Sequence, residues 1–418
     1  MAEITLEERE IAQKRTIRTL MAGLVPAGAA MSGAYSAAAV LGEELSGSET
    51  LGGLAAACMT TGSALATLPL ARLMMRHGRR PGLTVGYFLA SIGSLFAMFA
   101  ALSELYFLLP IGILGVGIGN AANLAARYAA ADLAAPDRKA RAIGTLVWAS
   151  TFGSVLGPTI GFGPAKSFGM LIGLPELAGP YVVSCLLFIA AGFVIHKNLH
   201  PDPLLISGES QNLKQDQGLK EAFKLLFVSP AGQLSVLSMV SGHVVMVGVM
   251  TMTPLHMKDG SHELEIIGFV ISLHIVGMYA VAPVIGWVVD RIGAGPVLIF
   301  GGSLLFLGSE LAAHTDKNDS LGVFVGLFLI GVGWSCGLVA SSALLTKTFE
   351  GPEKVRVQGL ADLIMTASGG LAGIGSGLLV ARTDYQTMSH NAAFIGLIPI
   401  VGYILFELNK RIRPVKKS

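Results

Sequence analysis

Methionine and histidine are concentrated in one stretch of an otherwise apolar chain. Six of the 16 methionines and four of the nine histidines lie between residues 239 and 278. Thioether sulfur favours Cu(I), and imidazole binds copper in either oxidation state. Magnesium or calcium would require carboxylate oxygens, and zinc is usually held by cysteine, histidine or carboxylate. The residue types in this stretch therefore indicate a copper site.

The spacing of these residues places them on two helical faces. Met246 and Met250 are one turn apart and follow His243, and His274 and Met278 are also one turn apart. We predict that the two methionines of the first helix bind the ion together with His274 and Met278, provided that the two faces turn toward each other. His243 would be an auxiliary ligand or a proton-linked group, because histidine titrates near neutral pH.

Three more residues follow near the outer end of the first helix. His256, Met257 and His262 could collect the ion and pass it inward, and a solvated loop is an equally good interpretation. Ordinary packing is the alternative for the methionines in general, because methionine is a flexible filler of apolar cores. Met239 and Met252, taken singly, fit that alternative best.

The elements that carry these residues are expected to cross a membrane. Of the 418 residues, 52% are hydrophobic and 13% are charged, and the mean hydropathy is +0.65. About 20 apolar residues span a bilayer core. Because the apolar runs are continuous rather than alternating, they predict helices and not a barrel. We predict an all-α membrane protein with twelve transmembrane helices, at 17–41, 50–75, 81–102, 105–131, 140–162, 178–196, 230–254, 264–288, 294–313, 320–346, 357–381 and 390–409.

Basic residues predict the orientation. With the N-terminus inside, the outer side holds only four of the 29 Lys and Arg, namely Lys166, Lys258, Lys317 and Arg382. This asymmetry predicts cytoplasmic termini and a multi-pass protein of the cytoplasmic (inner) membrane. The net charge of +2 gives no case for nucleic-acid binding. No nucleophile–base arrangement or nucleotide loop stands out, so we expect a monomeric protein in the lipid bilayer that is not an enzyme and needs no cofactor.

The two halves of the chain repeat. APDRKAR at 135–141 matches GPEKVRV at 351–357, and Gly153, Gly157 and Gly161 align with Gly369, Gly373 and Gly377 at the same offset. We predict an N-terminal six-helix bundle at 1–199, a cytoplasmic linker with an amphipathic helix at 200–229, and a C-terminal bundle with the metal site at 230–418. Two such pseudo-symmetric bundles are typical of rocking transporters with a site near the midplane.

A loop motif then makes the chain resemble the major facilitator superfamily. The family's GxxxDRxGRR motif is matched by Arg76, Gly78, Arg79 and Arg80, with Met75 at the acidic position. Since that acid helps to latch the cytoplasmic gate, the resemblance puts the first latch in doubt, and Arg79 and Arg80 are expected to engage Asp132 instead. The second copy keeps the acid and its neighbour, at Asp290 and Arg291.

The fifth predicted helix resembles the drug–proton antiporter branch of that superfamily. It carries a glycine–proline pattern in which the last glycine is replaced by Phe162, and the arginine that this branch expects in helix 4 is replaced by Ile113. Generic helix packing explains the glycines equally well. The pattern consists of Gly144, Gly153, Gly157, Pro158 and Gly161.

A closer resemblance concerns the four predicted metal ligands. Met246-x3-Met250 and His274-x3-Met278 look like the pattern of the CcoA-like copper importers, in which these four positions are implicated in copper uptake for assembly of the cbb3-type oxidase. The resemblance implies a copper importer that works by alternating access. The alternative is a proton-coupled transporter of drugs or small metabolites such as riboflavin, for which only Glu310 and Asp362 offer coupling carboxylates. A metal sensor is disfavoured, because the chain has no sizeable soluble domain.

Overall fold

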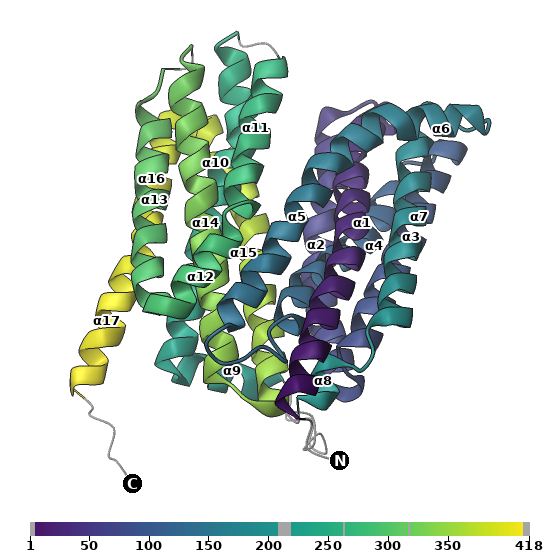
Figure 1. The fold of residues 1–418 in the computed structure, drawn as a ribbon. Coiled ribbons are helices and arrows are strands. Elements are labelled where there is room, and N and C mark those ends of the chain that lie inside the picture. Colours follow the sequence, from purple (N-terminus) through teal and green to yellow (C-terminus); the bar gives the residue numbers. More distant parts are fainter. Residues whose placement is uncertain (1–4, 208–218, 262–263, 317, 413–418) are drawn as a thin grey trace. The chain divides into compact units, whose positions relative to one another are not determined.

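The chain folds into helices that run in both directions along a common axis within each bundle (Figure 1). The computed structural model describes residues 5–207, 219–261, 264–316 and 318–412, and the regular structure of these residues is helical throughout, without strands. The predicted all-α class is therefore confirmed. Long helices are expected here because a helix satisfies all of its backbone hydrogen bonds internally, as a bilayer core demands.

Eleven helices in the described part of the chain are long and apolar enough to cross a membrane. The predicted span 140–162 also forms a helix, which is not among these eleven. The first half begins with the long helices α1 (Leu6–Ser46), α2 (Glu49–His77), α3 (Arg79–Ser103), α4 (Leu108–Ala129) and α5 (Lys139–Ile160). A π-helical turn (Gly161–Ala165), the short helix α6 (Lys166–Leu171) and a 3₁₀ turn (Glu176–Ala178) then lead to the long helix α7 (Gly179–Asn198).

Two predicted spans of the second half are interrupted. The helix predicted at 264–288 breaks after Tyr279 into α11 and α12, and the helix predicted at 390–409 breaks at Leu397 into α16 and α17. Pro283 just inside α12 accounts for the first break, since proline cannot supply a helical N–H. The helices after the linker are α10 (Pro230–Asp259), α11 (Leu264–Tyr279), α12 (Ala282–Ile292), α13 (Ala294–His314), α14 (Ser320–Thr348), α15 (Gly351–Arg382), α16 (Tyr385–Gly396) and α17 (Ile398–Ile412).

The linker contains two short helices, α8 (Pro203–Ile206) and α9 (Leu219–Val228). The helix α9 coincides with the amphipathic helix predicted from the sequence. Ala222 and Leu226, one turn apart, are buried, whereas Lys220 and Lys224 are exposed. One side of the helix is thus buried, and its other side carries exposed lysines together with exposed Phe223 and Phe227, so its role as an amphipathic surface helix stays a prediction.

Contacts between residues divide the chain into two units. Each unit consists mainly of one half of the sequence and includes a short segment of the other half. Unit 1 comprises Met1–Ala135, Ala149–Asp216 and Glu350–Leu363, and unit 2 comprises Pro136–Trp148, Gln217–Phe349 and Ile364–Ser418. The start of α15 thus packs in unit 1, and the start of α5 packs in unit 2. The division at 1–199 and 230–418 made from the sequence stays a prediction.

The repeated glycines are positions of close helix packing. In unit 1, a Cβ built on Gly153 would lie 2.8 Å from Cα of Gly28 in α1, and one on Gly161 would lie 3.3 Å from Cα of Gly33. In unit 2, the equivalent Gly369 lies against the ring of His243 in α10, where a Cβ would come within 2.2 Å of Cδ2. Small residues at such crossings are typical of membrane helices.

Candidate functional site

The first helical face of proposed ligands, which carries His243, Met246 and Met250, lies on α10 in unit 2. Met246 is buried with 5% of its surface exposed, and Met250 and His243 are half-buried. The helix α10 packs along α14 and contacts α11 over only a short stretch. The main neighbour of this face is therefore α14. That Met246 and Met250 meet the second face, which carries His274 and Met278, stays a prediction.

His274 on α11 is fully buried and held by α14. Its Nδ1 lies 2.6 Å from the carbonyl oxygen of Leu327. Because a carbonyl only accepts, Nδ1 carries the proton, and Nε2 of the neutral ring keeps its lone pair. Among the described residues, Nε2 has no hydrogen-bond partner. This is the state in which a histidine binds a metal ion, with its second nitrogen fixed by a backbone carbonyl.

Glycines in α14 allow this close approach. A Cβ built on Gly331 would lie 2.5 Å from the carbonyl oxygen of His274 and 3.1 Å from the backbone nitrogen of Met278. Met278 itself is buried. In the described part of the chain, no group of three or more His, Cys, Asp or Glu is arranged to hold a metal ion. A copper site at His274 would therefore depend on thioether ligands.

The ring of His243 is held from the side of α14. Nε1 of Trp334 donates a hydrogen bond to Nδ1 of His243, with 3.0 Å between the nitrogens. The Trp334 ring also stands edge-on to Tyr279 of α11, with 5.7 Å between centroids and an interplanar angle of 88°. This group, the His243–Trp334–Tyr279 cluster, links α10, α14 and α11. While the hydrogen bond lasts, Nδ1 of His243 is unavailable to a metal ion.

The sequence interpretation missed Trp334 and Tyr279. A signal was present, because Trp334 falls in the middle of the 29-residue helix α14. Tryptophan in membrane helices is enriched at the two interfaces, so a buried one at mid-depth is a candidate binding residue.

Two of the residues predicted near the outer end of the first helix, His256 and Met257, are packed rather than solvated. The helix α10 continues to Asp259, and His256 and Met257 are both buried. The His256 ring stacks on Tyr385 of α16, with 4.1 Å between centroids. The solvated-loop interpretation is therefore wrong for these two residues, and their role in ion entry stays a prediction. His262 lies outside the described residues.

The first copy of the loop motif lies in a buried network of unit 1. Nε of Arg79 donates to Oδ2 of Asp132 at 2.8 Å, which is the pair expected from the sequence, and Nη2 donates to Gln358 at 3.0 Å. Nζ of Lys354 lies 3.1 Å from Oδ1 of Asp132. Burial acts to raise the pKa of Asp132, but the charges of Arg79 and Lys354 outweigh it and hold this pKa below its ordinary value.

Arg80 has a different partner from the one expected. Its backbone nitrogen donates to Oδ2 of Asp202 at 2.7 Å, and its guanidinium lies 3.2 Å from Nδ1 of His200. Asp202 also accepts from the backbone nitrogen of Arg79, so it caps the start of α3. Gly78 has φ of +95° there, and a Cβ on it would lie 2.4 Å from the Asp202 carboxylate. Arg76 is exposed.

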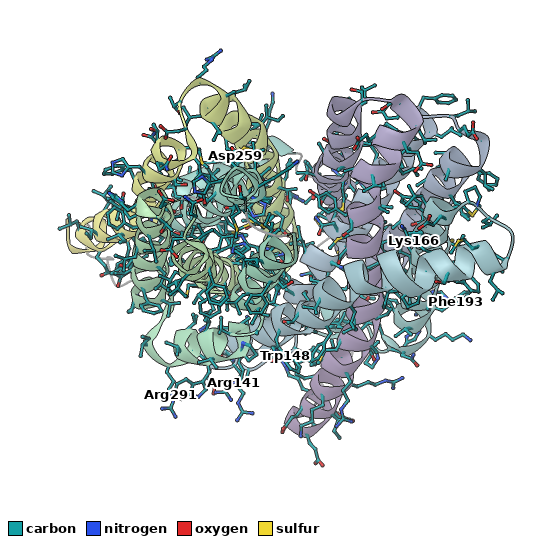
Figure 2. All side chains as sticks on the ribbon, turned by 90° about the horizontal axis from the view of Figure 1, so that it is seen from above. Arg141, Trp148, Lys166, Phe193, Asp259 and Arg291 are labelled. Atoms are coloured by element: carbon teal, nitrogen blue, oxygen red, sulfur yellow. The ribbon has the colours of Figure 1, made fainter. Side chains whose placement is uncertain are left out.

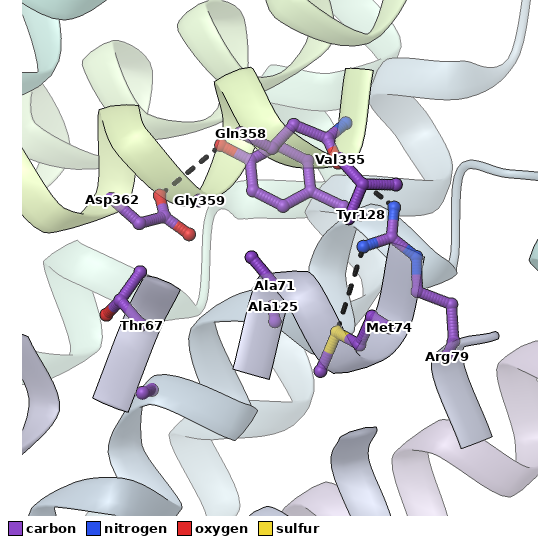
Figure 3. A pocket seen from close by; sticks show the side chains of 11 residues that line it. Thr67, Ala71, Met74, Arg79, Ala125, Tyr128, Val355, Gln358, Gly359 and Asp362 are labelled. Carbon is purple, nitrogen blue, oxygen red and sulfur yellow. Dashed lines mark hydrogen bonds between the residues drawn. The ribbon is translucent and has the colours of Figure 1, made fainter. Parts of the chain in front are cut away.

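A second buried ion pair lies beside this network. Arg127 of α4 donates from both of its Nη atoms to the carboxylate of Asp362, one of them at 3.3 Å. The hydroxyl of Tyr128 donates to the same carboxylate at 3.3 Å (Figure 3). A small cavity between them is lined by Thr67, Ala71, Met74, Arg79, Ala121, Ala125, Tyr128, Val355, Gln358, Gly359 and Asp362. The sequence singled out Asp362 as a candidate coupling carboxylate but could not assign it a partner.

The two copies of the loop motif differ at the acidic position. In unit 2, Asp290 accepts from the backbone nitrogens of Ala140 and Arg141 at 3.1 and 2.8 Å, so it caps the start of α5. Arg291 stacks on the Trp287 ring, and its side chain extends on the same side as that of Arg141 (Figure 2). In unit 1, the matching Met75 offers only its sulfur, 3.5 Å from Nη2 of Arg356.

A helical chain with two repeated bundles, apolar spans and a buried polar site defines a polytopic membrane transporter. The chain belongs to the Major Facilitator Superfamily, whose family model matches residues 20–263 and 261–418. Proteins of this family transport substrates across membranes and are not enzymes.

Three similar proteins illustrate the relationship. The uncharacterised MFS-type transporter YdeG of Bacillus subtilis is 32% identical over 400 residues, which cover 94% of this chain and 93% of that protein. The riboflavin transporter RfnT of Brucella anthropi is 25% identical over 382 residues, which cover 90% of each chain. The crystal structure of the human organic anion transporter MFSD10 matches with a TM-score of 0.76 at 15% identity, over 94% of this chain and 99% of that one. The last likeness concerns the fold alone.

Proposed function

We propose that this transporter imports copper across the cytoplasmic membrane by alternating access. The observation that carries the proposal is the state of His274. Its Nδ1–H is fixed by the Leu327 carbonyl, and its buried Nε2 has no hydrogen-bond partner among the described residues. A buried acceptor without a partner carries a desolvation penalty, and a cation bound at Nε2 would offset that penalty.

The neighbouring sulfur atoms favour copper over harder ions. Met246 and Met278 are buried, and Met250 is half-buried. Thioethers select Cu(I) among the biological cations, and a histidine in the same set is compatible with it. Met246, Met250, His274 and Met278 would then bind the ion, as in the CcoA-like importers that the sequence resembles. The imported copper would serve assembly of a cbb3-type oxidase.

The test is copper accumulation in cells that carry the wild type or a variant. His274→Ala and Met246→Ala should each reduce uptake to the level of cells without the transporter, at equal amounts of protein in the membrane. Met252→Leu is the matched control, because this methionine lies on α10 but outside the ligand set, and it should transport normally. Wild-type uptake by His274→Ala would refute the copper site.

A second candidate is transport of a flat aromatic metabolite such as riboflavin. It is supported by the similarity to RfnT and by the His243–Trp334–Tyr279 cluster, since aromatic rings bind planar heterocycles by stacking. This candidate predicts that Trp334→Ala abolishes riboflavin uptake while Met246→Ala leaves it intact. Copper uptake lost in Met246→Ala, with no riboflavin uptake in the wild type, would decide for copper.

A further inference from the structure

Three side chains of unit 2 meet where α13 ends and α16 begins, away from the proposed ligands. Nδ1 of His390 lies 2.8 Å from Oε1 of Glu310, and Nδ1 of His314 lies 3.4 Å from Oε2 of the same carboxylate. The two imidazole rings are 6.4 Å apart between centroids. Two imidazoles thus converge on one carboxylate.

The helices hold these residues in place by close packing. A Cβ built on Gly302 of α13 would lie 3.0 Å from the carbonyl oxygen of Gly396 in α16. Glu310 and His314 are one turn apart on α13, so their side chains share a face. Nδ1 of His314 also lies 2.9 Å from the backbone oxygen of Glu310, and the His390 ring stands edge-on to Phe394.

We propose that Glu310, His314 and His390 form a binding site for a divalent transition-metal ion. One carboxylate and two imidazoles are a ligand set that zinc, copper(II) and nickel(II) accept, with water in the remaining positions. Ligand atoms bound to one such ion at about 2.0–2.2 Å lie roughly 3 Å apart. The separations of 2.8 and 3.4 Å around the Glu310 carboxylate place both rings within reach of one ion at that carboxylate.

The carboxylate itself needs a cation. Only 19% of the Glu310 side chain is exposed. Its Oε1 atom is buried and makes no hydrogen bond among the described residues, and its near neighbour, Nδ1 of His390, forms an ion pair with it only when that ring is protonated. A buried carboxylate is costly unless its charge is balanced, and a metal ion shared with the two rings would balance it.

Binding requires the rings to turn. As the side chains stand, no group of three or more His, Cys, Asp or Glu within the described ranges is arranged to hold an ion. The side chains of His314 and His390 are 73% and 50% exposed, so both rings can rotate and both are accessible from solvent. His314 would exchange its contact with the Glu310 backbone oxygen for the metal.

This site differs in chemistry from the one proposed for copper import. It has no sulfur ligand, and it lies at the end of unit 2 that the basic residues predict to be outside. It would therefore prefer borderline divalent ions to Cu(I). Zinc binding at this site would not depend on which substrate the protein transports.

The experiment is titration of the purified full-length protein, prepared without a histidine tag, with Zn²⁺. We expect one zinc site in the wild type. The variants His390→Ala, His314→Ala and Glu310→Gln should each weaken zinc binding by at least about tenfold, as loss of a metal-supporting group usually does. His196→Ala is the matched control, since His196 is an exposed histidine of unit 1, and it should bind zinc like the wild type.

A second readout separates this site from the copper site. Co²⁺ should give visible absorption bands in the wild type and in His274→Ala, and these bands should be absent in His390→Ala. Equal zinc affinity in the wild type, His390→Ala and His314→Ala would overturn the inference. So would loss of the cobalt bands in His274→Ala with retention in His390→Ala, whatever the result of the copper uptake experiment. If Glu310→Gln does not fold, the two histidine variants decide.

Discussion

Trp334 donates the hydrogen bond from its Nε1 to Nδ1 of His243, across 3.0 Å between α14 and α10. Because indole only donates, His243 must accept at Nδ1 and carries its proton at Nε2 when neutral. A metal ion could use His243 only after this bond breaks. The pair thus fixes the tautomer of the one histidine that the sequence assigned an auxiliary role.

Removal of that donor is the first prediction. Trp334→Phe keeps an aromatic ring but leaves Nδ1 of His243 without the indole donor. We expect a loss of about 1 kcal/mol in the free energy of unfolding, the usual net contribution of a hydrogen bond. A lower midpoint of thermal unfolding in detergent would show it. Phe328→Leu, a change of a different aromatic residue on the same helix, should not alter the environment of His243 in NMR spectra, whereas Trp334→Phe should.

The buried network around Asp132 gives the second prediction. Asp132→Asn removes the charge that Arg79 and Lys354 share, and all three side chains are buried. Loss of one partner from a buried ion pair costs about 3–5 kcal/mol, because the remaining charge is left in a low-dielectric site. The thermal unfolding midpoint should therefore fall sharply.

The matched control breaks an exposed ion pair. Glu10→Gln removes the partner of Lys14 on α1, where both side chains are largely exposed. Exposed pairs contribute little, so this midpoint should stay near that of the wild type. A similar midpoint for Asp132→Asn and the wild type would show that the buried network does not stabilise the fold.

The same carboxylate predicts a dependence of stability on pH. The folded pKa of Asp132 lies below its ordinary value. As the pH falls below about 3.9, the unfolded chain takes up the proton first, and the stabilisation is lost as the pH drops through the folded pKa. Above that window the stabilisation is fully present. The gap in unfolding temperature between the wild type and Asp132→Asn should therefore narrow from pH 6 toward pH 3, and a constant gap would contradict the assignment.

Gly78 gives the fourth prediction. Its φ of +95° belongs to a region that side chains avoid, and a Cβ would collide with the Asp202 carboxylate that caps α3. Gly78→Ala should therefore destabilise unit 1 by at least about 1–3 kcal/mol. Gly375→Ala is the control, since Gly375 has open space around it and an ordinary helical φ. That change should be neutral or stabilising by up to about 1 kcal/mol. Equal effects of the two substitutions would remove the special role of Gly78.

The sequence alone determined the fold class and most of the helices. Apolar runs of about 20 residues leave the backbone little choice but helix in a bilayer, so the spans could be read from composition. The internal repeat and the loop motif indicated the family. The breaks after Tyr279 and at Leu397 were missed because the apolar character of the chain continues through both.

The Arg79–Asp132 pair could also be predicted from the sequence, because the motif supplies the arginine and the end of α4 supplies the acid. The partners of Arg80 and Arg127 could not, since Asp202 and Asp362 are distant in sequence and only packing brings them close. Glu310 was visible as an intramembrane acid, but its two histidines come from different helices and gain meaning only from their convergence.

The two helical faces of methionine and histidine also divide between what the sequence and what the tertiary structure determine. Their helical faces follow from spacing alone, because residues one turn apart lie on the same side of a helix. The tertiary structure decided that α14 packs along both α10 and α11, and that its carbonyl at Leu327 and its indole at Trp334 set the protonated nitrogen of His274 and of His243. Sequence spacing determines which side chains share a face, whereas the hydrogen bonds of neighbouring helices determine which atoms of those side chains are left to bind a substrate.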